Sequence, residues 1–506
     1  MMPGESSPES PSRPGRAGRG HGAFDGPNVD RLIAKGFDPH RRRRLPIPIR
    51  LVVALAALIG LGTVLLLLPG MTTRPITFMD ALFTATSAAA VTGLAVVSTS
   101  TDFTRVGQWV ILLLMQVGGL GFLVTLVLTV RLLGRHVSLM DRLSVSSSLG
   151  LASTQAILQI LSRTVAFMLA VEGAGALILW IHWRLSGIAP AGSAAFYALF
   201  HAVAAFCNAG FDLFYGLPEY PGGLPADPIS LLTLGALVIV GGLGIPVYIE
   251  LLNRRSARRA RSRNGIGTLL RTGHPRGGFR SWSLQTRLAV GSAVLLIAVG
   301  WAGLLIAEFR HPGVLTELPL GERLLRAWFQ SVAARTAGFP GFSDFANINE
   351  ASRLLLMCLM FIGSAPASMG GGITTGTFSV LAVAMWSFVR GYGAVRAGQR
   401  SISGATVWRA LAVLVISLGV VMGVAWLLLL SQDVAFSAGL FEVISAFSTT
   451  GLSLGITGQL DTFGRLLIIA TMFWGRLGAI TIMLALLKRG MRQSLVKYPE
   501  ETVLVG

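Results

Sequence analysis

Val91-Thr92-Gly93-Leu94 decides the fold, because the chain contains a segment of this form four times. In each copy, small or hydroxylated residues lead into a glycine and then an apolar residue, and an aromatic residue stands about ten positions earlier. The glycines recur at intervals of about 115 to 130 residues, which leaves room for two membrane helices and a shorter segment. We call the copies strips 1 to 4; strips 2 to 4 are Asn208-Ala209-Gly210-Phe211, Thr336-Ala337-Gly338-Phe339 and Thr449-Thr450-Gly451-Leu452.

The composition is that of a membrane protein. Of the 506 residues, 53% are hydrophobic and only 13% are charged, and the mean hydropathy is +0.67. Soluble proteins carry about 25% charged residues. We therefore expect an all-α membrane protein with four tandem helix–pore loop–helix repeats around a pseudo-fourfold pore, made of eight transmembrane helices and four re-entrant pore helices. The expected spans are 47–69, 105–130, 160–185, 229–251, 284–307, 350–388, 406–430 and 464–487.

Polar and basic stretches divide the chain. Residues 1–45 have no apolar core, so they predict a disordered cytoplasmic tail, and they lack the apolar region of a signal peptide. The four pore repeats are expected at 46–135, 158–253, 283–390 and 405–490. The remaining segments are expected to be a cytoplasmic linker helix at 136–157, a basic cytoplasmic loop at 254–282, a cytoplasmic loop at 391–404 and a cytoplasmic C-terminal tail at 491–506.

The net charge of +19 follows from the topology. Arginines concentrate in loops on one side of the predicted spans, so that side and both termini are expected to be cytoplasmic. This distribution favours contact with lipid headgroups over nucleic-acid binding, although the basic loop at 254–282 could also bind a cytosolic partner. The opposite loops are mildly acidic, which favours cations. Their carboxylates are Asp80, Asp102, Asp212, Glu219, Asp227, Asp344, Glu350 and Asp433.

The strips predict a cation filter. A cation loses its hydration shell only where oxygen dipoles replace it, and converging backbone strands supply rings of carbonyls. Glycine allows the positive φ angles that turn successive carbonyls inward. One such motif alone would more often be a helix-packing site, but four copies favour the filter. We expect the ion at the carbonyls of Thr92, Asn208, Thr336 and Thr450.

The sixth expected span contains a candidate gate. Between 361 and 377 it holds too many glycines, and a proline, for a continuous helix, so this loop should line the cavity beneath strip 3. A simple proline kink is the alternative. Arg476 lies in the middle of the last span and should face the pore, as an electrostatic barrier, or a buried partner. The candidate loop residues are Gly363, Pro366, Gly370, Gly371, Gly372, Thr374, Thr375 and Gly376.

These residues resemble the Trk/Ktr/HKT superfamily of potassium transporters, and most closely its Ktr-type membrane subunit. The resemblance covers about residues 45–506 and implies that K⁺ is the transported ion, because Gly93 matches the position where potassium-selective members keep glycine. It also implies a homodimer on a cytosolic ring of nucleotide-binding regulatory subunits, an obstructing loop and an arginine barrier. The matching segments are 116–122, 208–212, 334–339, 449–453 and 498–506.

We therefore expect a potassium-selective translocation subunit in a bacterial cell membrane, with channel-like conduction under the control of a cytosolic partner. A symporter that couples K⁺ to Na⁺ or H⁺ is the alternative, and the sequence does not separate the two. The two cysteines, Cys207 and Cys358, lie in predicted membrane segments, and no loop contains a catalytic or metal-ligating constellation. We therefore expect neither an enzyme nor a bound cofactor.

Overall fold

The computed structural model describes residues 47–120, 154–190, 192–220, 222–252, 282–310, 314–316, 318–342, 344–398 and 400–478. The predicted tails at 1–45 and 491–506 lie outside these residues, as do nearly all of the linker at 136–157 and of the basic loop at 254–282.

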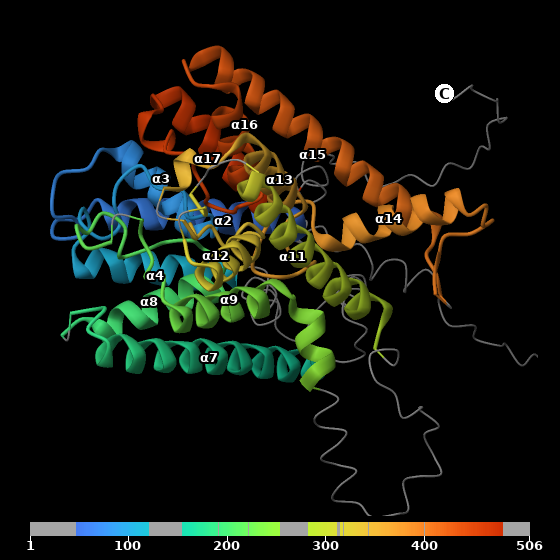
Figure 1. Cartoon of the computed structure of the whole chain (residues 1–506), viewed down its shortest axis with the longest axis horizontal. Coiled ribbons are helices and arrows are strands. Elements are labelled where there is room, and N and C mark those ends of the chain that lie inside the picture. The colour runs from blue at the N-terminus through green and yellow to red at the C-terminus, as the bar shows by residue number, and fades with distance from the viewer. Residues whose placement is uncertain are drawn as a thin grey trace, which may run out of the picture. The chain divides into compact units, whose positions relative to one another are not determined.

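Three kinds of helix recur in one order along the described chain, and we call them outer, short and inner helices (Figure 1). The outer helices are α2 (Ile47–Leu66), α7 (Thr154–Leu185), α11 (Leu284–Arg310) and α15 (Gly404–Ser431). The short helices are α3 (Phe78–Ala89), α8 (Ala194–Phe206), α12 (Leu320–Ala333) and α16 (Phe436–Phe447). The inner helices are α4 (Arg105–Gly119), α9 (Pro228–Gly242), α13 (Glu350–Ile362) and α17 (Thr462–Leu477). Each strip follows a short helix.

The remaining elements are small additions to this order. Helix α14 (Thr375–Val389) follows α13 after a twelve-residue break, and a two-stranded antiparallel hairpin, β1 (Arg396–Ala397) and β2 (Arg400–Ser401), leads into α15. Two 3₁₀ turns, Phe345–Asn347 and Thr457–Gln459, follow strips 3 and 4.

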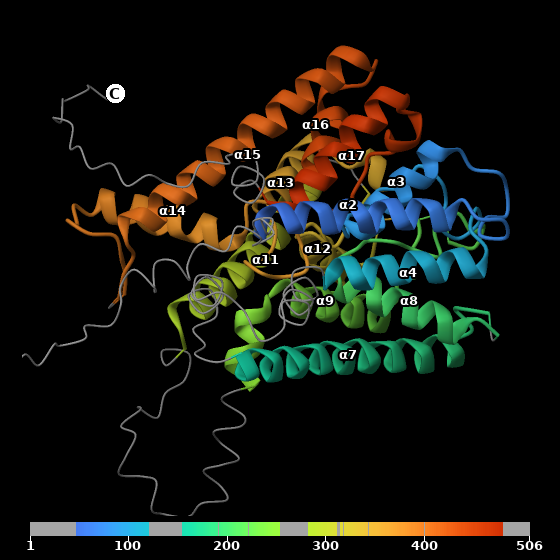
Figure 2. The ribbon, with the colours of Figure 1, turned by 180° about the vertical axis from the view of Figure 1, so that it is seen from behind.

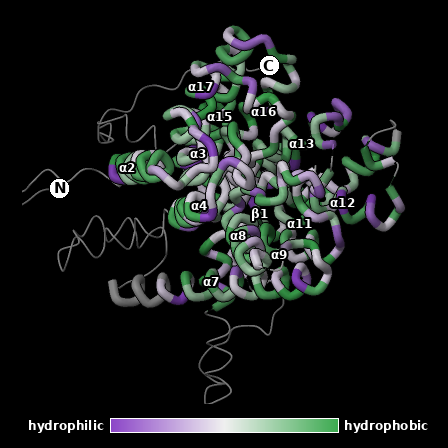
Figure 3. Tube along the Cα trace, turned by 90° about the vertical axis from the view of Figure 1, so that its left-hand side faces the viewer, coloured by the Kyte–Doolittle hydropathy of each residue, from purple (hydrophilic) through white to green (hydrophobic). Residues whose placement is uncertain are grey.

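The outer helices are built to face lipid. In the described chain, four helices are long and apolar enough to cross a membrane, and they are the four outer ones. Only 22% to 33% of each apolar window is buried inside the protein, so most of this surface requires an apolar solvent. Green, apolar stretches accordingly cover much of the helical tube in Figure 3.

Every inner helix begins with the same kind of side-chain N-cap. The side chain of its N-cap residue accepts a hydrogen bond from the backbone N–H three positions on, which satisfies one of the free donors of the first turn. A glycine follows each cap by fourteen positions. In three of the inner helices, a Cβ atom on that glycine would overlap the last carbonyl groups of the preceding short helix. The cap and glycine pairs are Thr104 and Gly118, Asp227 and Gly241, Asn349 and Gly363, and Asp461 and Gly475.

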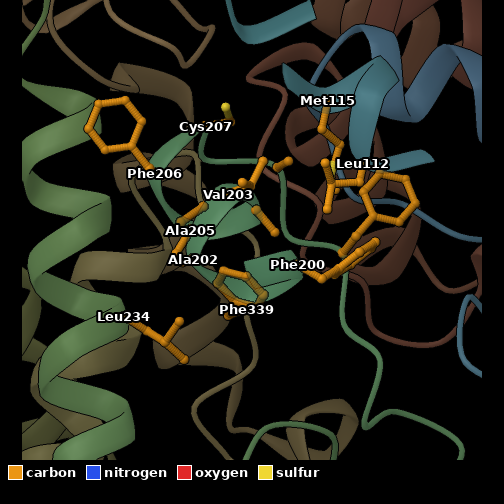
Figure 4. Close-up of a cluster of buried hydrophobic side chains, with 14 of the residues drawn as sticks. Leu112, Met115, Phe200, Ala202, Val203, Ala205, Phe206, Cys207, Leu234 and Phe339 are labelled. Carbon is orange, nitrogen blue, oxygen red and sulfur yellow. The ribbon is translucent and has the colours of Figure 1, made fainter. Parts of the chain in front are cut away.

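The helices close into a ring. Each inner helix contacts the short helix of the next set: α4 packs on α8, α9 on α12, α13 on α16, and α17 returns to α3. Figure 3, turned by 90° from Figure 1, shows these helices gathered around one centre. In Figure 2 the helices α2, α4, α8 and α7 follow one another from top to bottom. In Figure 4, Phe200 of α8 lies toward Leu112 of α4, whereas Phe206 lies on the opposite side, toward the helix that carries Leu234.

One expected span differs from the structure. The continuous helix expected at 229–251 is broken between α9 and a helix at Ile245–Leu252, and the two parts meet at 92°. Gly244 provides the turn with φ of 83°. The break expected in the sixth span is present between α13 and α14, where Gly363 has φ of 71°. The expected spans at 105–130 and 464–487 extend beyond the described residues, so the count of eight stays a prediction.

Candidate ion pathway

Each strip glycine lies against the next strip. A Cβ atom on Gly210 would lie 2.8 Å from the Ala337 carbonyl oxygen, closer than real side chains approach. Cβ atoms at the other three glycines would overlap the equivalent oxygen. Because strip 4 meets strip 1 in this way, the strips form a closed ring in chain order. The overlapping pairs are Gly93 with Ala209, Gly338 with Thr450, and Gly451 with Thr92.

The backbone of every strip alternates in handedness. The residue two positions before each glycine has a positive φ, although it carries a side chain, and so does the glycine itself. This alternation turns successive peptide groups the same way, so that their carbonyls point to one side and their N–H groups to the other. The non-glycine residues are Val91, Asn208, Thr336 and Thr449, with φ of 57°, 57°, 76° and 50°.

The N–H groups of the strips donate hydrogen bonds to the ends of the short helices. In strip 1 the Thr92 N–H donates to the Ser87 carbonyl at 2.8 Å, and the Gly93 N–H donates to the Ser87 hydroxyl at 3.0 Å. Strip 4 repeats both bonds through Ser445, at 2.8 and 3.1 Å. The carbonyls of these residues therefore face away from the helices, toward the centre of the ring.

The ring sets the carbonyls in register. The carbonyls one position before the glycines belong to Thr92, Ala209, Ala337 and Thr450, and those two positions before belong to Val91, Asn208, Thr336 and Thr449. The set expected from sequence, Thr92, Asn208, Thr336 and Thr450, therefore combines residues from two levels. At the second level, the Asn208 amide donates to the Thr336 hydroxyl at 3.0 Å.

A cavity opens beyond the strip glycines. It has a volume of about 450 Å³ and is lined by all four of them, together with the segments that follow each strip.

Most of the carboxylates that were expected to make the pore mouth acidic have a basic partner. Asp344 lines the cavity and accepts hydrogen bonds only from Asn347 among its described partners. The paired carboxylates are Asp80 with Arg465, Asp102 with Arg74, Asp212 with His201, Asp227 with His182, and Glu350 with Arg353.

The loop between α13 and α14 lies against the opposite side of the strips. A Cβ atom on Gly370 would overlap the Thr336 hydroxyl, and one on Gly371 would lie 2.7 Å from the Thr449 hydroxyl. The loop is also bound to α9, since the Ala365 N–H donates to the Gly242 carbonyl at 3.0 Å. The glycines predicted for the gate thus lie directly next to strips 3 and 4.

Of the other predicted gate residues, the Pro366 ring packs beside Gly376, and the Thr375 N–H donates to the Ser364 carbonyl at 2.8 Å. Thr374 has φ of 70°, and Gly372 lies against Gly363.

Arg476 joins three parts of the ring. Its guanidinium, at the end of α17, donates to the Met369 carbonyl of the loop and to the Gly118 and Gly119 carbonyls of α4, the last at 3.1 Å. Carbonyls at a helix C-terminus lack partners within the helix and carry partial negative charge, which suits a cation. Of the two roles expected from sequence, these contacts are those of an anchor bound to backbone carbonyls.

A buried polar cluster lies behind strip 2, and the sequence predicted its carboxylate, Glu172, to be paired but not which residues pair with it. Glu172 of α7 is only 3% exposed, and its carboxylate accepts hydrogen bonds from the Gln116 amide of α4 at 3.1 and 3.2 Å. The Cys207 thiol, directly before strip 2, lies 3.9 Å from the same carboxylate. A charge within an apolar helix was the available signal, but its partners come from distant helices.

Comparisons with known proteins agree with this architecture. A family model described as a cation transport protein, TrkH, matches residues 47–497. The chain is 36% identical to the Ktr system potassium uptake protein B of Bacillus subtilis over 88% of this chain and 94% of that protein. Identity to the protein of the same name from Vibrio alginolyticus is 35%, over 96% and 98%.

A solved structure has the same fold. The crystal structure of the potassium transporter TrkH from Vibrio parahaemolyticus superposes with a TM-score of 0.64 and 18% identity, over 90% of this chain and 88% of that one. The family match spans most of the chain, and the two relatives exceed 30% identity over nearly their whole lengths. This chain therefore belongs to the TrkH family of cation transport proteins.

Proposed function

We propose that this chain is the potassium-translocating subunit of a bacterial K⁺ uptake system. The observation that carries the proposal is the closed ring of four strips with alternating φ, since it presents two levels of carbonyl oxygens to one axis. Such rings replace the hydration shell of a monovalent cation. The relatives named for potassium uptake agree with K⁺ as the ion.

The proposed pathway runs from the cavity through the strips to the glycine loop. K⁺ binds between the level of Thr92, Ala209, Ala337 and Thr450 and the level of Val91, Asn208, Thr336 and Thr449. Because the C-terminal ends of the short helices lead into the strips, their partial negative charge also favours a cation. In this proposal the chain forms four pore repeats with eight membrane spans, and both termini are cytoplasmic.

The loop from Gly363 to Thr374 is the proposed gate. Its glycines touch the hydroxyls of Thr336 and Thr449, so an ion leaving the strips meets this backbone. Arg476 holds the loop in place through Met369. Movement of the loop under a cytosolic partner would open the path. The Ktr system names of the relatives support a partner subunit, and we propose a homodimer on a ring of nucleotide-binding subunits.

Glu172 supports a second candidate, a symporter that couples K⁺ to Na⁺ or H⁺. A carboxylate this deeply buried in a membrane helix is a common place for a coupling ion or proton. It also lies next to Cys207, the residue before strip 2. Flux into liposomes with a fixed K⁺ gradient and varied Na⁺ and pH separates the two: a channel follows the K⁺ gradient alone, whereas a symporter requires the second gradient.

Gly93→Ser tests the filter. Its Cβ atom would overlap the Ala209 carbonyl of strip 2, so it should displace an oxygen of the ring and reduce the preference for K⁺ over Na⁺. The measurement is relative K⁺ and Na⁺ flux of the purified protein in liposomes. Gly60→Ser is the matched control, because a Cβ atom at Gly60 meets nothing within 4 Å. Unchanged selectivity in a folded Gly93→Ser protein would remove Gly93 from the filter.

A further inference from the structure

His201 and Asp212 form a buried pair at the outer end of strip 2. His201 lies on α8 and is completely buried, and Asp212 is 7% exposed by its side chain. Asp212 follows Phe211, the last residue of strip 2, and lines the 450 Å³ cavity. The two side chains thus connect the short helix behind strip 2 with the wall that an arriving ion meets.

Both ring nitrogens of His201 face oxygen atoms. Nδ1 lies 2.7 Å from the Tyr197 carbonyl oxygen, which only accepts, so Nδ1 must carry a proton. Nε2 lies 2.9 Å from Oδ1 of Asp212. A neutral imidazole has one N–H and one lone pair, so its Nε2 would direct a lone pair at an ionised carboxylate. The close approach therefore requires one more proton than a neutral His201 and an ionised Asp212 possess.

Two placements of that proton fit the contacts. Nε2 donates to Oδ1 as an imidazolium, or a protonated Asp212 donates to Nε2, which then also accepts from the Leu213 N–H at 3.2 Å. Either way the pair has no net charge. Without the proton, the pair would be a buried anion: Oδ1 accepts a hydrogen bond from the Phe214 N–H at 2.7 Å, whereas Oδ2 has no hydrogen-bond partner among the described residues.

The surroundings supply no other charge that could balance this carboxylate by direct contact. The imidazole is packed by the rings of Trp183 from α7 and Phe214 from the loop after strip 2, at 5.4 and 5.1 Å. The titratable and charged groups packed around the pair include three others. The Tyr197 ring lies 6.3 Å from the imidazole, Tyr220 packs on Phe214, and the Arg105 guanidinium lies over the Tyr197 ring. His182, the neighbour of Trp183 in the chain, forms a separate pair with Asp227.

We propose that His201 and Asp212 form a proton-binding site that positions strip 2 and sets the charge of the outer cavity wall. With the proton bound, the wall beside strip 2 is neutral. When the proton leaves, the wall gains one negative charge next to the entrance of the strips. The proposal rests on the K⁺ pathway proposed above, and it makes external pH a determinant of K⁺ affinity.

The charge acts over a short distance. A unit charge about 10 Å from an ion changes ion affinity by about two- to fifteenfold when the effective dielectric constant lies between roughly 80 and 20. The concentration of K⁺ that gives half-maximal flux should therefore fall by about two- to fifteenfold when the pair loses its proton.

Two variants fix the pair in opposite states. Asp212→Asn is neutral at every pH, since its amide donates to Nε2 of a neutral His201, so its half-saturating K⁺ concentration should be high and independent of pH. His201→Gln leaves Asp212 ionised, so its half-saturating K⁺ concentration should be low and independent of pH. If the pair served only to pack strip 2 in place, both variants should lower K⁺ flux to a similar degree.

The experiment measures K⁺ flux in proteoliposomes against K⁺ concentration over a pH series. His182→Gln is the control for the second histidine–aspartate pair and should keep the wild-type profile. A flat wild-type profile, a profile that survives in Asp212→Asn, or one that disappears in His182→Gln would overturn the proposal. If neither pair variant folds, the wild-type titration decides alone. Absence of any K⁺ flux from the wild type would instead refute the proposed function.

Discussion

Replacement of Arg476 tests how the loop is held. In the structure its guanidinium donates to three backbone carbonyls, of which only the Met369 carbonyl belongs to the loop. A hydrogen bond from a charged group contributes about 1.5 to 3 kcal/mol. Loss of the single bond to Met369 should therefore raise the population of a displaced loop by about 10- to 150-fold, because 1.4 kcal/mol corresponds to a factor of ten. We expect Arg476→Ala to increase basal flux by up to this factor.

Arg476→Lys separates an anchor from an electrostatic barrier. Lysine keeps the positive charge, but its single ammonium group cannot donate to carbonyls on both sides as the planar guanidinium of arginine does. A barrier that repels cations predicts wild-type flux in Arg476→Lys, whereas an anchor predicts flux close to that of Arg476→Ala. Selectivity for K⁺ over Na⁺ should stay at the wild-type value in both, because the three carbonyls that accept hydrogen bonds from Arg476 lie outside the strips.

The assay is uptake of K⁺ or Rb⁺ into liposomes without a regulatory subunit, expressed per folded protein. Arg465→Ala is the control on the same helix: it removes the 2.7 Å ion pair with Asp80, which lies away from the loop. We expect it to leave basal flux unchanged. Wild-type or lower flux in a well-folded Arg476→Ala protein would refute the anchor, and an equal rise in Arg465→Ala would show that the effect is not specific to the loop.

Gly371→Ala should also raise basal flux, since its Cβ atom would lie 2.7 Å from the Thr449 hydroxyl and would push the loop from the strips; Gly393→Ala, which meets nothing within 4 Å, should not, and the same uptake assay compares them. Gly118→Ala should lower the melting temperature or prevent folding, because its Cβ atom overlaps the Ala89 carbonyl, and thermal unfolding against Gly60→Ala measures this. Glu172→Gln should keep flux that follows the K⁺ gradient alone if the protein conducts as a channel, whereas loss of a Na⁺ or pH requirement present in the wild type would support the symporter.

Local patterns in the sequence predicted the parts of the pathway that local chemistry determines. The strips are visible because glycine must stand where φ is positive and the next strip lies close, as at Gly93. The break before α14 is visible because Gly363, Pro366 and three consecutive glycines cannot continue a helix. These requirements act within a few residues, so a single chain displays them.

Contacts between distant segments were not predictable in the same way. The level at which one strip meets another depends on strips more than a hundred residues apart, so the sequence did not indicate which of the expected carbonyls lie at the same level. The bend after α9 depends on the loop, because the Ile245 N–H donates to the Ala367 carbonyl at 3.0 Å. A local signal was nevertheless present, because Pro246 follows Gly244 by two positions and a proline interrupts a helix.

The ring is symmetric at the strips, where we propose that ions bind, and asymmetric at the loop, where we propose that they leave. Fifteen positions after their caps, three inner helices carry small residues, Gly119, Gly242 and Ser364, whereas the fourth carries Arg476. A Cβ atom at Gly119 would lie 2.9 Å from the Cys207 sulfur and 3.6 Å from the Met369 sulfur, so the small residue leaves space for the loop. A single loop from the third set, which lies directly next to strips 3 and 4, can therefore be fixed by one arginine from the fourth. Four equal loops would compete for the same space, so the gate that we propose uses one loop and departs from the fourfold symmetry at this level.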